Sequence, residues 1–201
     1  MIGVVDYEAG NLRSVETALT RLGASFRIVD SGEELSELDH LIIPGVGDAN
    51  YCMGVLRSRG LEEGIGEFFR SGKPMLGICL GSQVVLESSE EREATCLGLI
   101  PGQAVRFPRD LGEKVPHMGW NEVTPTAKHW LFAGIPEGTA FYFVHSYYPR
   151  PESEEAVIAT SEYGISFPAA IERENLVATQ FHPEKSGEFG LRMLSNFLNR
   201  G

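Results

Sequence analysis

The stretch Gly77-Ile78-Cys79-Leu80-Gly81-Ser82-Gln83 follows a β-forming run, Pro74 to Ile78, and precedes a helical pattern. It is a cysteine version of the G-x-S-x-G nucleophile elbow, in which glycine on both sides of the nucleophile permits a sharp turn between strand and helix. At such a turn the thiol projects over the sheet edge, and the helix N-terminus behind it favours the thiolate. A tight turn around a buried cysteine explains the motif equally well when it is taken alone.

The sequence before this elbow alternates short β-rich runs with amphipathic stretches, which is typical of a parallel sheet covered by helices. From Leu12 to Leu22, apolar residues recur at steps of three and four, and Gly23 ends the pattern. A second helical pattern covers about Leu61 to Phe69. The sheet should be at least four strands wide, with strands at Ile2 to Val5, Phe26 to Val29, Leu41 to Ile43 and Pro74 to Ile78.

From about residue 97 the chain has short β-forming runs separated by proline and glycine, which favours antiparallel hairpins added to the parallel core. A final helix is expected from about Phe189 to Leu198. We therefore predict an α/β fold in which an open, mostly parallel central sheet is flanked by helices, in a single domain of residues 1–201. The strands expected in this half are Gln103 to Phe107, Asn121 to Val123, Ala140 to Val144, Ala156 to Thr160, Ala169 to Ile171 and Leu176 to Phe181.

Composition and charge argue against several classes of protein. The chain has 17 Lys and Arg against 28 Asp and Glu, a formal net charge of -11, which disfavours a nucleic-acid partner. No run approaches the roughly 20 apolar residues that cross a bilayer, and Met1 to Asp6 lacks the basic region of a signal peptide, so we expect a cytoplasmic protein without a membrane partner. Neither a disulfide framework nor a metal site is expected, because the histidines lack ligand spacing and no CxxC pair occurs among Cys52, Cys79 and Cys96.

A base for a cysteine nucleophile is offered by His182, in the run Phe181-His182-Pro183-Glu184-Lys185. If this run is extended, residues two apart point to the same side, so Glu184 can reach the imidazole and set its tautomer. An isolated His-Pro-Glu run is more often a surface loop with a solvated glutamate. Together with the elbow, it favours a triad of Cys79, His182 and Glu184.

Thioester chemistry also needs donors for an oxyanion, and backbone amides in a glycine-rich loop are suitable. The amide of Leu80 directly follows the nucleophile. The run Pro44-Gly45-Val46-Gly47 ends the strand Leu41 to Ile43, at the sheet edge where ligands bind in open α/β folds, and its Val46 amide is the second candidate. A plain loop is an equally good interpretation of this run.

These residues resemble the class I, triad-type glutamine amidotransferases, and among them the glutaminase subunits of imidazole glycerol phosphate synthase in histidine biosynthesis. The resemblance runs nearly from end to end. The elbow and the His-x-Glu run mark the superfamily, whereas Gly10-Asn11-Leu12 and Pro116-His117-Met118-Gly119-Trp120-Asn121 single out these subunits. Two positions depart from the pattern and put local packing in doubt: Glu8 replaces the usual glycine, and Ser82 the usual methionine.

The resemblance implies that Cys79 attacks the side-chain amide of glutamine, that His182 passes the proton to the departing ammonia, and that water releases glutamate from the thioester. It implies no cofactor. Ammonia would pass to a partner (β/α)8-barrel cyclase that makes imidazole glycerol phosphate and aminoimidazole carboxamide ribotide. No barrel sequence follows Gly201, so we expect the cyclase to be a separate chain and the assembly a heterodimer.

Further site residues are implied by the same resemblance. Those expected to hold glutamine are Gly47, Gln83, His145, Ser146 and Tyr147. Those expected to face the cyclase are Asn11, Trp120, Tyr142 and Lys185, although Trp120 and Tyr142 suit a core equally well. A hypothesis on regulation follows: hydrolysis stays weak until the cyclase binds its ligand, because one oxyanion amide within Gly45 to Gly47 points the wrong way.

Three alternatives remain open at this point. Another amidotransferase, such as the glutaminase of pyridoxal phosphate synthesis, would keep the triad but dock on a different synthase; the run from His117 to Asn121 speaks against it. A cysteine-elbow chaperone or peptidase usually has its histidine much nearer the cysteine than His182 is to Cys79. A non-catalytic interaction protein would not need an intact nucleophile, base and orienting carboxylate.

Overall fold

A central eight-stranded sheet organises the chain, in the order β2-β1-β3-β4-β14-β13-β12-β9. The structure is a computed structural model that describes residues 1–8 and 12–200. Five neighbouring strands run parallel: β1 (Ile2–Val5), β2 (Phe26–Val29), β3 (His40–Ile43), β4 (Met75–Ile78) and β14 (Leu176–Thr179). Three antiparallel strands extend this core: β13 (Ser166–Arg173), β12 (Val157–Glu162) and β9 (Thr124–Pro125). The predicted α/β fold is confirmed.

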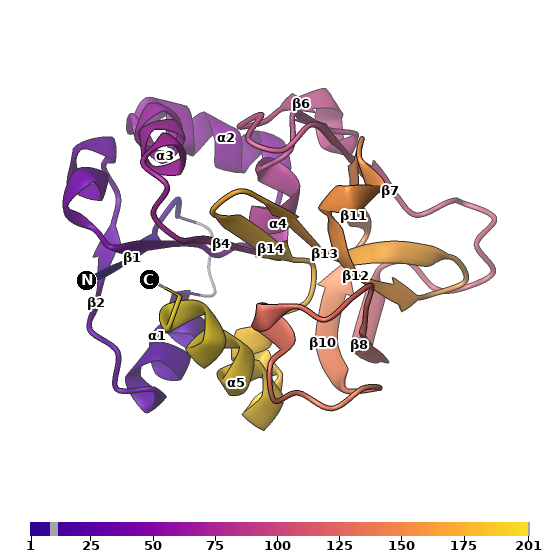
Figure 1. Cartoon of the computed structure of the whole chain (residues 1–201). Coiled ribbons are helices and arrows are strands. Elements are labelled where there is room, and N and C mark those ends of the chain that lie inside the picture. The colour runs from indigo at the N-terminus through magenta and orange to yellow at the C-terminus, as the bar shows by residue number, and fades with distance from the viewer. Residues whose placement is uncertain (9–11, 201) are drawn as a thin grey trace.

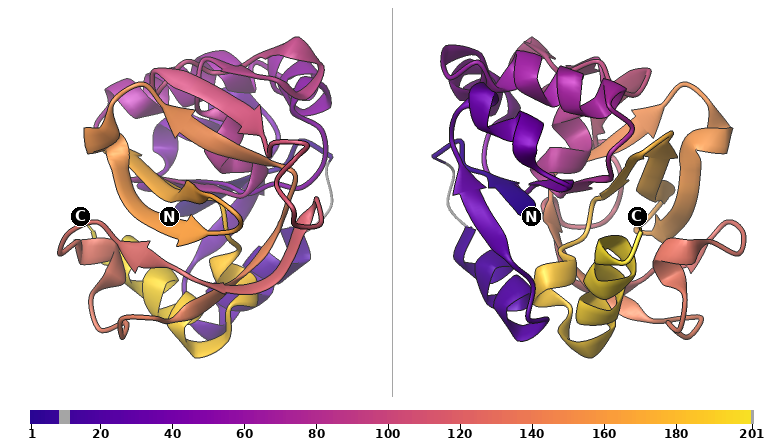
Figure 2. Two further views of the ribbon diagram at one scale, coloured as in Figure 1. Left: turned by 90° about the vertical axis from the view of Figure 1, so that its right-hand side faces the viewer. Right: turned by 60° about the vertical axis from the view of Figure 1, so that its left-hand side comes forward.

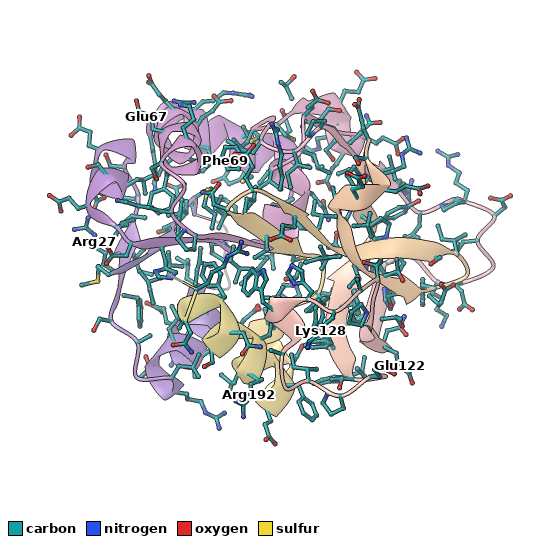
Figure 3. The ribbon with its side chains drawn as sticks, viewed as in Figure 1. Arg27, Glu67, Phe69, Glu122, Lys128 and Arg192 are labelled. Carbon is teal, nitrogen blue, oxygen red and sulfur yellow. The ribbon has the colours of Figure 1, made fainter. Side chains whose placement is uncertain are left out.

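Helices cover both faces of the sheet (Figure 1). Helices α2 (Ala49–Ser58) and α3 (Leu61–Arg70) lie on one face, and α1 (Leu12–Arg21) and α5 (Gly187–Leu198) on the other. Strands β1 and β4 are therefore buried along their whole length, which explains their continuous apolar sequences. The exposed side chains of Glu67 on α3 and Arg192 on α5 mark the two opposite outer surfaces (Figure 3). Within the described ranges, no helix is long and apolar enough to cross a membrane.

Two smaller sheets pack beside the far end of the central sheet, where Figure 2 (left) shows them facing the viewer. One has the order β11-β7-β5-β6, and the other pairs β10 with β8. Short helices connect the strands, and α4 (Leu80–Val84) directly follows β4. The strands are β5 (Ser88–Ser89), β6 (Ala94–Thr95), β7 (Gly102–Arg106), β8 (His117–Glu122), β10 (Ala140–His145) and β11 (Tyr147–Pro151).

The structure corrects several sequence-based expectations. Helix α2 and strand β11 were not predicted; β11 contains Pro149 and Pro151, which a strand tolerates here because β11 is at a sheet edge. Strand β8 begins at His117, earlier than the expected Asn121. Strand β14 forms the predicted hairpin with β13, but it also pairs in parallel with β4. That parallel pairing brings the residues after β14 beside the elbow.

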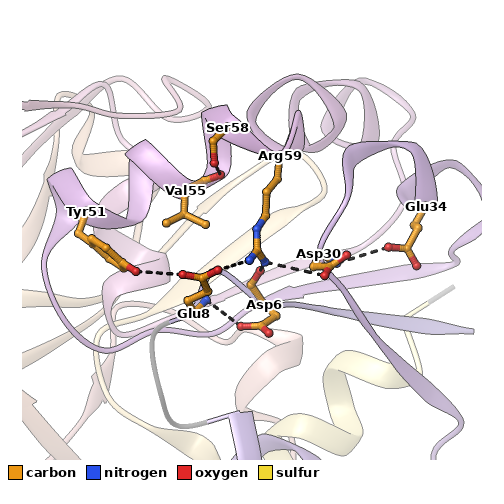
Figure 4. A network of polar contacts seen from close by, with 8 residues as sticks. All are labelled: Asp6, Glu8, Asp30, Glu34, Tyr51, Val55, Ser58 and Arg59. Atoms are coloured by element: carbon orange, nitrogen blue, oxygen red, sulfur yellow. Dashed lines mark hydrogen bonds and ion pairs between the residues drawn. The ribbon is translucent and has the colours of Figure 1, made fainter.

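Glu8, one of the two departures from the family pattern, has a left-handed backbone with φ of 65°. This conformation suits glycine and costs another residue about 1–2 kcal/mol. The Glu8 carboxylate pairs with Arg59 and accepts a hydrogen bond from the Tyr51 hydroxyl at 3.2 Å (Figure 4). Arg59 also donates to the Asp6 carbonyl at 3.2 Å. These contacts with α2 and its C-terminal end hold Glu8 in place.

Candidate active site

Cys79 sits between β4 and α4 with φ of 53° and ψ of -105°, a strained conformation that costs of order 1–3 kcal/mol. Gly81 permits the turn, because a Cβ at this position would collide with the carbonyl oxygen of Ile43 in β3. Ser82, the second departure from the family pattern, is fully buried, and its hydroxyl donates to the Cys79 carbonyl at 2.7 Å. Serine at this position thus satisfies a backbone acceptor beneath the nucleophile.

His182 and Glu184 form the predicted contact. The imidazole Nδ1 lies 2.7 Å from Glu184 Oε1, and both side chains are completely buried. The expectation of an extended run is wrong, since Pro183–Lys185 form a 3-10 turn, begun by a proline whose φ already suits it. An Nδ1–H that donates to the carboxylate leaves Nε2 as the nitrogen available to accept a proton.

The electrostatics of this group favour a charged imidazole. Burial alone would lower the pKa of His182, but the neighbouring Cys79 sulfur and the Glu184 carboxylate outweigh burial and raise that pKa to about 10. An imidazolium at this place stabilises a thiolate on Cys79. The arrangement therefore suits a nucleophilic thiolate paired with a proton-carrying histidine.

The other two cysteines lie in different surroundings. Burial raises the pKa of Cys52 above its ordinary value and that of Cys96 to about 11, so both stay as thiols at neutral pH. Both side chains are buried in the core between the sheet and α2, as free cysteines without a disulfide bond. Of the three cysteines, only Cys79 lines the cavity beside the elbow.

Gln180 is a residue of the site that the sequence reasoning missed. Its side chain is fully buried, and its Nε2 donates to Cys79 Sγ at 3.6 Å. Its Oε1 accepts a hydrogen bond from Gln83 Nε2 at 3.0 Å, and the same Gln83 nitrogen donates to the Tyr147 carbonyl at 3.0 Å. Because the Gln83 amide nitrogen has two acceptors, its carbonyl oxygen remains for a ligand. The signal for Gln180 was its position two residues before His182.

A buried chain of polar groups supports this region from behind. His145 Nδ1 donates to the Tyr147 carbonyl at 2.8 Å, so its Nε2 accepts from His117 Nδ1 at 3.0 Å. His117 Nε2 then accepts from Asn121 Nδ2 at 3.4 Å. Each histidine is therefore neutral with a defined tautomer. Through its hydrogen bond to the Tyr147 carbonyl, His145 holds the backbone of Tyr147 in position.

This histidine pair predicts a loss of stability in acid. Burial lowers the pKa of His117 to about 4 and that of His145 to about 3, against about 6.5 in an unfolded chain. Between these pH values the two histidines are protonated in the unfolded chain but not in the folded protein. The contribution of the neutral pair to stability is therefore complete above about pH 6.5 and declines as pH falls toward 3. Urea unfolding between pH 7 and pH 4.5 should show this decline, and a shallower one in His117→Gln. Equal slopes in the two proteins would contradict the assignment.

The two candidate oxyanion donors are not both directed at the thiol. The Leu80 amide donates to the Gly45 carbonyl oxygen at 3.4 Å, so a carbonyl occupies the place expected for an oxyanion. In a trans peptide the N–H points opposite to the carbonyl, so the Val46 N–H is directed away from Leu80. Gly47, with φ of 108°, follows this peptide and is exposed. Rotation of the Gly45–Val46 peptide would assemble the pair.

A cavity of about 260 Å³ opens beside Cys79. All five residues predicted to hold glutamine line it: Gly47, Gln83, His145, Ser146 and Tyr147. Glu91 also lines it and was missed by the sequence reasoning; burial raises the pKa of its carboxylate, and its Oε2 accepts from the Ala49 amide at 2.8 Å. Among the described residues that line the cavity none is Lys or Arg, and Glu91 is the one carboxylate.

An exposed aromatic face adjoins the triad. Trp120 is 59% exposed and contacts Tyr142 of the neighbouring strand, and Lys185 Nζ lies 5.9 Å from the centre of the Tyr142 ring. Trp120 is thus a surface residue rather than core. Met118, which the sequence reasoning did not propose, is 64% exposed on the same side of β8. Asn11, the fourth residue predicted for a partner face, lies outside the described residues.

The chain resembles known proteins over nearly its whole length. Residues 3–200 match the family model described as "Glutamine amidotransferase class-I". The chain is 48% identical over 198 residues to "Imidazole glycerol phosphate synthase subunit HisH" of Desulfitobacterium hafniense, covering 98% of this chain and 93% of that protein. It is 45% identical over 199 residues to the protein of the same name from Dehalococcoides mccartyi, covering 98% and 96%.

Solved structures share the fold at lower sequence identity. The "Structure of PurLQS from Thermotoga maritima" superposes with a TM-score of 0.78 at 20% identity, covering 98% of this chain and 97% of that chain. A "Crystal structure of glutamine amidotransferase" gives a TM-score of 0.72 at 22% identity, covering 98% of each. These likenesses concern the fold alone.

Proposed function

The chain belongs to the glutamine amidotransferase class-I family, and we propose that within this family it is the glutaminase subunit of an imidazole glycerol phosphate synthase in histidine biosynthesis. The observation that carries this proposal is the 45–48% identity to subunits of that name, which extends over 98% of this chain. In this role the chain hydrolyses glutamine to glutamate and ammonia. The ammonia passes to a separate cyclase subunit that incorporates it. The glutaminase of another synthase, such as that of pyridoxal phosphate synthesis, is not favoured, because the relatives described above are named as subunits of imidazole glycerol phosphate synthase.

The chemistry proposed for the site runs through Cys79. Its thiolate adds to the side-chain carbonyl carbon of glutamine, and the carbonyl oxygen becomes an oxyanion. His182 gives its proton to the amide nitrogen, and the C–N bond breaks. Ammonia departs, and a γ-glutamyl thioester remains on Cys79. His182 then takes a proton from water, which attacks the thioester, and the thiolate departs as glutamate forms. Glu184 keeps the imidazole oriented and stabilises its charge.

The oxyanion requires donors that the present loop does not direct at it. The Leu80 amide can donate to the oxyanion once the Gly45 carbonyl no longer accepts its hydrogen bond. Rotation of the Gly45–Val46 peptide would add the Val46 amide as a second donor. One such donor is worth about 100- to 1000-fold in rate. This orientation fits the hypothesis that the isolated chain hydrolyses glutamine weakly. Binding of the liganded cyclase would then favour the rotated peptide.

Recognition of glutamine as an amino acid rests on two kinds of group. The α-ammonium meets the Glu91 carboxylate and the side-chain oxygen of Gln83. The α-carboxylate is held by backbone amides around Ser146 and Tyr147 and beside Gly47, since none of the described residues that line the cavity is Lys or Arg. Glutamine is thus distinguished from simple amides by its charged end.

Replacing Glu91 by glutamine should raise the KM for glutamine by about 10- to 100-fold, because a hydrogen bond to a charged group is worth about 1.5–3 kcal/mol. The kcat should change little, since the α-ammonium lies away from the bond that breaks. Glu93→Gln, two residues along the same turn and exposed, is the matched control. Steady-state glutamate release measures both parameters. A fall in kcat with an unchanged KM would show that Glu91 does not bind the ammonium.

The aromatic face is the proposed site for the cyclase. Met118 and Trp120 expose apolar surface on β8, the half-buried Tyr142 of β10 contacts Trp120, and Lys185 lies beside Tyr142 in the turn that carries Glu184. Exposed Trp and Met are enriched at protein interfaces. A partner on this face would lie beside His182, whose ring centre is 6.3 Å from that of Tyr142.

The proposed function is tested by glutamate release from glutamine, measured with and without a histidine-pathway cyclase and its ribulosyl ligand. We expect activity that rises when the liganded cyclase is present. If glutamate is not released with this cyclase but is released with another synthase, the proposed pathway is overturned and the glutaminase chemistry is kept. Silence with every synthase would favour a non-catalytic protein.

A further inference from the structure

Tyr7 lies directly beneath the loop that carries Val46. It follows β1, its side chain is only 2% exposed, and it packs in the core with α2. Its hydroxyl is buried beside the Val46 N–H and the Cys52 thiol, but none of the described residues meets it in good hydrogen-bond geometry. Buried hydroxyls nearly always have a partner, so this one calls for an explanation.

The Tyr7 hydroxyl touches the peptide whose rotation the site requires. A Cβ at Gly45 would collide with the hydroxyl oxygen, so Gly45 is the residue that allows this close approach. Burial raises the pKa of Tyr7 well above its ordinary value, the charges of Cys52 and Cys79 add to this, and the Val46 N–H opposes it. The Val46 N–H is therefore on the side of Tyr7, while the Gly45 carbonyl is on the side of Leu80.

Rotation of this peptide exchanges the two groups. The Val46 N–H then points toward the oxyanion, and the Gly45 carbonyl points into the buried space beside Tyr7. A carbonyl in that space needs a donor, because a buried acceptor without one is costly. A phenolic hydroxyl supplies a donor, and phenylalanine, with the same shape, does not.

We propose that Tyr7 is a positioning residue for glutamine hydrolysis: its hydroxyl donates to the Gly45 carbonyl when the Gly45–Val46 peptide turns to place the Val46 amide in the oxyanion hole. This inference rests on the proposed glutaminase function. In the present orientation the hydroxyl faces the Val46 N–H, which is itself a donor, so the hydroxyl donates to this peptide only after the peptide has turned. A purely structural Tyr7 would act through its ring, which Tyr7→Phe retains.

The test compares Tyr7→Phe with the wild type, each in complex with the liganded cyclase. We expect kcat to fall by about 5- to 150-fold, the rate equivalent of a buried carbonyl that loses its donor, with the KM for glutamine unchanged. Alkylation of Cys79 by iodoacetamide should keep its rate, because it needs the thiolate but no oxyanion hole. The melting temperature should be unchanged or higher, since a buried hydroxyl without a partner is removed. Tyr51→Phe, on the exposed side of α2, is the matched control and should retain the wild-type kcat.

Two results would overturn the role of Tyr7. A Tyr7→Phe enzyme with the wild-type kcat would mean that the hydroxyl is not needed. Equal losses in hydrolysis and in alkylation would mean that Tyr7 acts on the thiol instead of the peptide. Both leave the proposed function intact, whereas a wild type that does not hydrolyse glutamine rejects the function and this inference together.

Discussion

Replacing Cys79 by alanine is expected to lower glutamine hydrolysis by about 10⁴-fold or more, because the thioester cannot form without the nucleophile. Neither remaining cysteine can substitute, since Cys52 and Cys96 are buried elsewhere as neutral thiols. Glutamate release by the complex with the cyclase measures the effect. Alanine fits the buried site, so the fold should persist.

The matched control for this variant is Cys96→Ala, which should keep the wild-type rate of hydrolysis. A second control supplies ammonium salt directly to the complex that contains Cys79→Ala. The cyclase reaction should then proceed, because external ammonia bypasses the glutaminase step. Hydrolysis by Cys79→Ala at a rate comparable to the wild type would contradict the assignment of the nucleophile.

The second large effect is expected for His182→Gln, which should lower kcat by about 10³- to 10⁴-fold. This change removes both the proton carrier and the positive charge that stabilises the thiolate. Alkylation of Cys79 by iodoacetamide should therefore slow as well. This distinguishes His182→Gln from Tyr7→Phe, in which only hydrolysis should fall. Alkylation at the wild-type rate in His182→Gln would mean that the imidazolium does not stabilise the Cys79 thiolate.

The parallel core and the elbow were predictable because local sequence determines them. Glycine at 77 and 81 permits a turn that brings α4 against Ile43, and strands such as Ile2–Val5 are apolar throughout because both faces are buried. The pairing of His182 with Glu184 was predictable from two residues of separation, although the 3-10 turn that achieves it was not.

The rest of the site depends on contacts between distant segments. Gln180 reaches Cys79 only because β14 pairs in parallel with β4, a choice that no local pattern in residues 176–179 dictates. Glu91 enters the cavity through a turn held to α2 by the Ala49 amide. The orientation of the Gly45–Val46 peptide was not predictable, because glycine permits both orientations and contacts with the distant residues Tyr7 and Leu80 distinguish them.

Cys79 should carry a γ-glutamyl group during turnover, and acid quenching followed by peptide mass mapping detects that group directly. The complex with the liganded cyclase would be mixed with glutamine, quenched within the first turnovers, digested and searched for glutamyl-modified cysteine. We predict the modification on the peptide that contains Cys79, and its absence in Glu184→Gln samples that no longer turn over. Modification of Cys52 or Cys96 instead, or release of glutamate with no modified cysteine at any time, would show that Cys79 is not the nucleophile that carries the γ-glutamyl group.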